Sequence, residues 1–60
     1  MSNRIQAGTF AEACFNNNTV AELQAASAAG PDAADMEAWN ITAQEWRDAI
    51  AQALAAKLEG

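Results

Sequence analysis

The sequence predicts an all-α protein, a small bundle of three or four short helices whose longest helix is C-terminal. Alanine, the residue with the highest helix propensity, supplies seventeen of the 60 residues. Threonine precedes glutamate by three residues at three places, which is the spacing of a helix capping box. The C-terminal segment also repeats apolar side chains with a helical period, so helix is favoured over sheet throughout.

The capping signals set where each helix begins. The three boxes are Thr9 with Glu12, Thr19 with Glu22, and Thr42 with Glu45. A fourth start follows Gly30 and Pro31, where Asp32 is placed to cap. Asparagines at 16–18 tolerate left-handed backbone and compete for helical hydrogen bonds, so the first helix ends there. The predicted helices span 10–16, 20–29, 33–39 and 43–58, in a single helical domain over 9–60 that follows a flexible N-terminal arm at 1–8.

The last predicted helix has the clearest amphipathic pattern. Its apolar arc consists of Trp46, Ile50, Ala53, Leu54 and Leu58. Ile41 directly precedes the Thr42 cap and is placed to pack on Trp46 as a hydrophobic staple. We therefore expect Ile41, Trp46, Ile50 and Leu54 to face the same core as Leu23.

The core that these residues can build is thin. Only fourteen apolar side chains are larger than alanine. In a chain this short, the free energy gained by burying them nearly cancels the entropy lost on folding. We therefore expect a marginal monomer that is stabilised by self-association or by a larger protein partner.

Composition excludes several kinds of site. With no histidine, no tyrosine and one cysteine, the chain lacks the groups that usually transfer protons or ligate zinc. The acids at Asp32, Asp35 and Glu37 lack the glycine and the spacing of a calcium-binding EF-hand loop. Cys14 shares a helix face with Phe10 and is expected to be a buried, apolar thiol. The sequence thus predicts neither an enzyme nor a cofactor site.

Location and nucleic-acid binding follow from charge and cysteine usage. One cysteine cannot form an internal disulfide, and no secretory signal or apolar run of about 18 residues is present, so a cytoplasmic location without membrane insertion is expected. The net charge of −5, with only three basic residues, disfavours nucleic acid. A helix-turn-helix register does fit, with Glu22 first, Ala26 fifth, Gly30 ninth, Met36 fifteenth and Trp39 eighteenth. Carboxylates would, however, occupy the surface of its second helix that faces DNA.

The function that these observations favour is a non-catalytic, acidic helical module for protein–protein interaction or regulation. It would present apolar and aromatic side chains rimmed by carboxylates, and tryptophan is frequent at binding hot spots. The candidate partner-binding residues are Trp39, Met36, Asp35, Glu37 and Leu58. Two alternatives stay open: a helix-turn-helix regulator that binds nucleic acid, and an acidic inhibitor from a mobile element that mimics nucleic acid.

Overall fold

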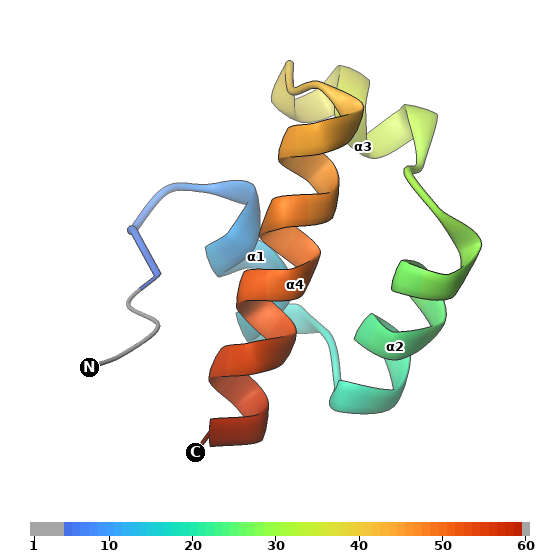
Figure 1. Ribbon diagram of the computed structural model, residues 1–60. Coiled ribbons are helices and arrows are strands. Elements are labelled where there is room, and N and C mark those ends of the chain that lie inside the picture. The colour runs from blue at the N-terminus through green and yellow to red at the C-terminus, as the bar shows by residue number, and fades with distance from the viewer. Residues whose placement is uncertain (1–4, 60) are drawn as a thin grey trace.

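Four helices make up the described part of the chain, residues 5–59 of a computed structural model (Figure 1). They are α1 (Phe10–Asn17), α2 (Val20–Ala29), α3 (Ala33–Trp39) and α4 (Ala43–Glu59). The predicted all-α class is confirmed, and α4 is the longest helix at 17 residues. All four helices begin at the predicted residue, while α1 and α4 each extend one residue further than expected.

The helix starts show how far each capping box is formed. At Thr19 and at Thr42 the box is complete: the threonine Oγ1 accepts from the backbone N–H of the glutamate three residues later at 3.1 Å, and that carboxylate accepts from the threonine N–H at 2.8 Å. At Thr9 only the first half forms, because the Glu12 carboxylate accepts from the Gly8 N–H instead, at 2.8 Å. Helix α1 still begins at Phe10, but its Glu12 carboxylate binds the backbone one residue before the Thr9 cap.

The helix ends differ from the expectation for asparagine. Asn18 ends α1 in an extended conformation, and its N–H donates to the Cys14 carbonyl at 3.1 Å. The asparagine with left-handed backbone is instead Asn40, with φ 54°, directly after α3. Gly30 ends α2 at φ 96°, where a residue with a Cβ would be strained.

The hydrophobic core is built around α4. Helices α1 and α2 make most of the contacts with it, and α3 makes fewer. The buried cluster comprises Phe10, Cys14, Leu23, Trp46, Ile50 and Ala53. Ile41 and Leu54 are half-buried and pack against this cluster, so the predicted shared core of the last helix and Leu23 is confirmed.

The segment with the helix-turn-helix spacing consists of α2 and α3, and both helices pack on α4. Helices α2 and α3 dock on different parts of α4, and the larger interfaces between described helices all involve α4 (Figure 1). Leu23 is fully buried, whereas Met36 is half-buried and Trp39 keeps 40% of its surface exposed. The segment from Glu22 to Trp39 therefore consists of two helices, α2 and α3, that both pack on α4 and share no extensive interface with each other.

The predicted N-terminal arm at 1–8 lies partly outside the described residues, which begin at Ile5. From Gln6 onward the chain turns into α1. The Thr9 hydroxyl donates to the Gln6 carbonyl at 2.7 Å, and the Gly8 N–H is held by Glu12. These bonds place Gln6 beside the first turn of α1.

Candidate interaction surface

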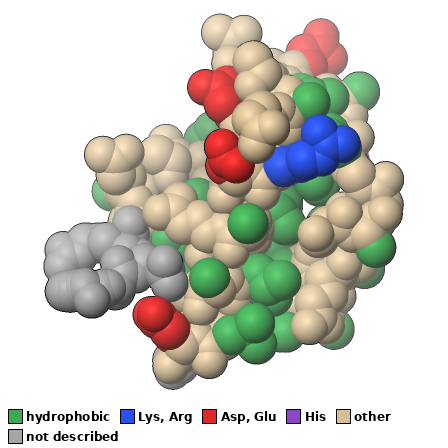
Figure 2. Space-filling model, in the orientation of Figure 1, with side chains coloured by type: hydrophobic (Ala, Val, Ile, Leu, Met, Phe, Trp, Pro, Cys, Tyr) green, Lys and Arg blue, Asp and Glu red, His purple; other side chains and the backbone are tan. Residues whose placement is uncertain are grey.

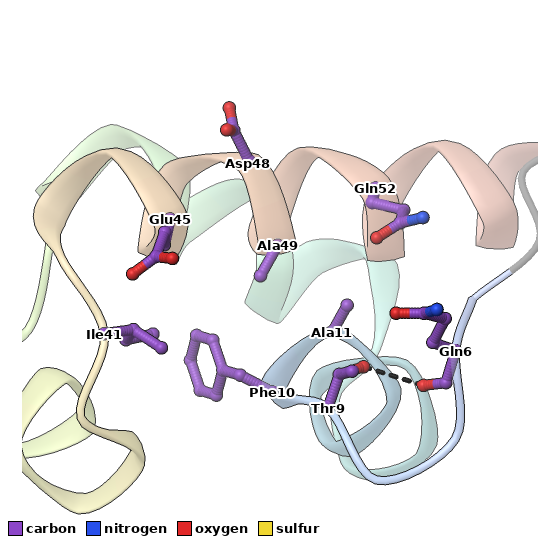
Figure 3. Close-up of a pocket in the computed structure, with 9 residues that line it drawn as sticks. All are labelled: Gln6, Thr9, Phe10, Ala11, Ile41, Glu45, Asp48, Ala49 and Gln52. Atoms are coloured by element: carbon purple, nitrogen blue, oxygen red, sulfur yellow. Dashed lines mark hydrogen bonds between the residues drawn. The ribbon is translucent and has the colours of Figure 1, made fainter.

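An open groove of about 420 Å³ lies between the start of α1 and the N-terminal half of α4 (Figure 3). Its apolar lining comes from Phe10 and Ala11 of α1, Ile41 of the α3–α4 connection, and Ala49 of α4. Its polar lining is formed by Gln6, Thr9, Glu45, Asp48 and Gln52. We call this feature the α1–α4 groove.

The groove exists because small residues stand where the two helices meet. Ala11 is 4% exposed, and Ala49 is half-buried against the core. A longer side chain at either position would extend into the space. Glu45, Asp48 and Gln52 recur three and four residues apart on α4, a spacing that places them along one edge of the helix.

Phe10 connects the groove to a second aromatic side chain. Its ring centroid lies 5.8 Å from that of Trp39 at an interplanar angle of 51°, and 6.4 Å from that of Trp46. Phe10 and Trp46 are buried, while Trp39 is 40% exposed. The Phe10 ring therefore contacts both the groove and the exposed Trp39.

The α4 edge of the groove carries two acids, Glu45 and Asp48, and no basic residue lies in the described lining. The Glu45 carboxylate accepts from the Thr42 N–H through Oε1, and Asp48 accepts from the Gln44 side-chain amide at 2.9 Å. Both carboxylates are exposed. In Figure 3 the Glu45 side chain turns toward Ile41, whereas Asp48 stands on the outer side of α4 and points away from Phe10. No lysine or arginine is among the described residues that line this groove.

The candidate partner-binding residues from the sequence do not form one surface. Trp39 adjoins the groove through Phe10. Asp35 is half-buried and accepts a hydrogen bond from the Trp46 indole N–H at 3.2 Å, which gives it a structural role. Met36 packs against the core, and Glu37 is exposed on α3 outside the groove lining.

Leu58, the fifth candidate, is 64% exposed near the end of α4. Figure 2 shows hydrophobic side chains gathered over the C-terminal half of α4 and toward α2. Leu58 does not line the α1–α4 groove, so the chain has accessible apolar surface in more than one place.

The groove residues that sequence reasoning missed are Phe10, Ile41, Glu45 and Asp48. The sequence does hold a weak signal for them. Glu45, Asp48 and Gln52 form a polar stripe on α4, and Ala49 lies between this stripe and the apolar arc of Trp46, Ile50 and Ala53. A stripe of this kind indicates an edge of the buried face, but it does not show that an aromatic side chain from another helix lies next to it.

Cys14 is free and buried, as expected. Burial raises the pKa of its thiol above the ordinary 9.0, and the Asp35 carboxylate raises it further. The thiol is therefore protonated near neutral pH. A protonated, buried thiol is a poor nucleophile and a poor metal ligand.

Comparison with known proteins gives no family for this chain. No family model, curated protein or solved structure matches it. Among the described residues, none of the helices has both the length and the hydropathy needed to cross a membrane.

Proposed function

We propose that this chain is a non-catalytic protein-interaction module that binds a larger protein, or a second copy of itself, through the α1–α4 groove and Trp39. The observation that carries the proposal is an open groove with an apolar floor of Phe10, Ile41 and Ala49, whose Phe10 ring also packs against the exposed Trp39. The single buried thiol fits a reducing cytoplasm, where cysteines stay unpaired.

Two properties of this surface support binding over a purely structural role. A volume of about 420 Å³ falls within the usual range of roughly 300–1,000 Å³ for ligand pockets. Tryptophan covers a large contact area with few rotatable bonds, so its binding costs little conformational entropy. In a chain with a small core, 40% exposure of Trp39 leaves apolar area that a partner would bury.

A displayed library of random peptides, selected on the immobilised full chain, tests the proposal. Selected peptides should bind with micromolar Kd by calorimetry. Ala49→Gln places a longer side chain in the groove and should raise that Kd at least about tenfold, which corresponds to about 1.4 kcal/mol. Ala51→Gln, the same change at an exposed position of α4, should leave the Kd unchanged.

A second variant guards against a folding defect in Ala49→Gln. Trp39→Ala removes the exposed indole outside the groove and should also weaken the selected peptides, with helical content by circular dichroism unchanged. If no peptide reaches micromolar affinity, or if Ala49→Gln and Trp39→Ala both bind like the parent chain, this surface is not the docking site and the proposal is wrong.

A further inference from the structure

We infer that the α1–α4 groove takes a cationic, amphipathic segment of a partner protein, with an apolar side chain on the Phe10–Ile41–Ala49 floor and a lysine or arginine against Glu45. This inference rests on the proposed function and names the chemistry of the partner. It is carried by the charge of the groove edge together with the apolar character of its floor.

The charge at the groove is of one sign. Glu45 and Asp48 are both exposed on the α4 edge, and the lining contributes no cation within residues 5–59. Glu45 uses Oε1 for the Thr42 N–H, so Oε2 is the oxygen that can accept from a partner. Figure 3 shows the Glu45 side chain turned toward the Ile41 end of the floor, where a bound cation would sit beside apolar surface.

Lysine and arginine match this arrangement better than other polar side chains. Their long methylene stems can cover apolar surface while the charged head reaches a carboxylate at the rim. On a partner helix, a basic residue three or four positions from an apolar one lies on the same face and would meet the groove edge and floor together. An acidic segment would be repelled by Glu45 and Asp48.

Charge also argues for a foreign partner over a second copy. A second copy would bring a net charge of −5 to the acidic edge of this groove, where repulsion opposes docking. The described cations of the chain are both on α4: Arg47, and Lys57, whose Nζ lies 4.8 Å from the Phe15 ring centroid. A second copy would therefore supply little positive charge to the groove.

The test uses two synthetic amphipathic peptides of equal length, with leucine on one helical face and either lysine or glutamate on the other. Binding to the full chain is measured by calorimetry at low and at physiological salt. The groove variant is Glu45→Gln with Asp48→Asn. Glutamine keeps the acceptor that the capping box needs, so the variant removes charge without removing the cap.

The matched control is Glu22→Gln with Glu37→Gln. It also removes two negative charges, but at positions outside the groove lining. One of them, Glu22, belongs to a complete capping box, as Glu45 does. The lysine peptide should bind the parent chain, and its Kd should rise about fivefold for the groove variant at low salt, as expected for rim charges. The control should change the Kd by less than about twofold, as a distant, screened charge does.

Three results would overturn the inference. The first is an equal rise in the Kd of the lysine peptide for the groove variant and the control. The second is binding of the glutamate peptide as tight as that of the lysine peptide, and the third is no binding of the lysine peptide. Each rejects a cationic partner without deciding whether the groove binds at all. Whether the groove binds any peptide is tested separately by the displayed-peptide selection with Ala49→Gln. Failure of the cationic-partner inference can therefore be distinguished from failure of the proposed function.

Discussion

The indole N–H of Trp46 donates a hydrogen bond to the Asp35 carboxylate at 3.2 Å, and this bond ties α3 to α4. Trp46 is 2% exposed, so its N–H would be costly to leave without an acceptor. Helix α3 has no fully buried residue and makes fewer contacts with α4 than α1 or α2 does. Asp35 is therefore a principal anchor of α3, and through α3 it sets the position of Trp39.

Loss of the Asp35 carboxylate should destabilise the fold. Asp35→Ala leaves the Trp46 N–H without its acceptor and should lower the free energy of unfolding by about 1–2 kcal/mol. Asp35→Asn, which keeps an acceptor oxygen, should cost less. Urea denaturation followed by tryptophan fluorescence measures both. Glu37→Ala, an exposed acid two residues away, serves as control, and equal losses for Asp35→Ala and Glu37→Ala would show that the hydrogen bond adds nothing.

The Thr42 cap should contribute measurably to α4. Thr42→Ala removes the oxygen that accepts from the Glu45 N–H at 3.1 Å and should lower the free energy of unfolding by about 1 kcal/mol. Thr42→Ser keeps the hydroxyl and should stay within about 0.5 kcal/mol of the parent chain. Thermal and urea unfolding of the three proteins test this, and a Thr42→Ser variant as unstable as Thr42→Ala would point to the lost methyl group instead.

Local signals in the sequence are enough to predict the helix starts and most of the core. A capping box needs only residues three apart, and an apolar arc needs only one helix, so Thr42, Trp46 and Ile50 could be assigned from neighbours in the chain. The groove could not. Phe10 and Ala49 line it from two helices, and their proximity depends on how α1 is angled across α4, which the hydrophobic period of one helix does not encode.

The role of Asp35 illustrates the same limit. In the sequence it is one of several acids at the start of a short helix, and a solvated carboxylate is the simplest expectation. Its contact with Trp46, eleven residues away, requires α3 to fold back over the start of α4 through the left-handed Asn40. Trp39 likewise could not be assigned to core or surface until the position of α3 was known.

Cys14 should make stability depend on alkaline pH. Burial and then Asp35 raise the pKa of the folded thiol above the ordinary 9.0, which is the value expected when the chain is unfolded. The stabilisation from the protonated thiol is therefore fully present below pH 9.0 and is lost as pH rises through the higher folded-state pKa. Urea unfolding between pH 8 and 11 should show a decline that Cys14→Ala reduces. A Cys14→Ala profile parallel to that of the parent chain would contradict this.

Self-association should be visible as a dependence of stability on concentration. Exposed apolar side chains such as Leu58, together with the small core, predict a thermal midpoint that rises with protein concentration. Leu58→Gln should flatten that dependence if the C-terminal part of α4 forms the contact. Calorimetry over a hundredfold range of concentration, with mass by sedimentation, is the measurement. A sharp transition at one temperature and a monomeric mass throughout would leave only a foreign partner for the module.

Nucleic acid should not bind this chain at physiological salt, and this prediction separates the proposed module from a helix-turn-helix regulator. Even non-specific duplex binding, with Kd of about 10⁻⁴ to 10⁻⁶ M, requires several lysines and arginines to replace counterions on phosphate. The described cations are Arg47 and Lys57, both on α4, while Asp32 at the N-cap of α3 and Glu37 within α3 are exposed acids.

A fluorescence titration with labelled duplex and single strand tests this at low and at physiological salt. Micromolar binding that weakens steeply with added salt would favour the regulator, with the exposed Asn40 as its candidate base contact. If the chain instead displaced nucleic acid from a basic protein, Glu37→Lys would separate two explanations. A mimic that uses α3 would lose competition in that variant. A module that binds the same protein through the α1–α4 groove would still compete as the Glu37→Lys variant. It would lose competition in the Glu45→Gln, Asp48→Asn variant, because the cation of the basic protein then docks beside Ile41 and not on α3.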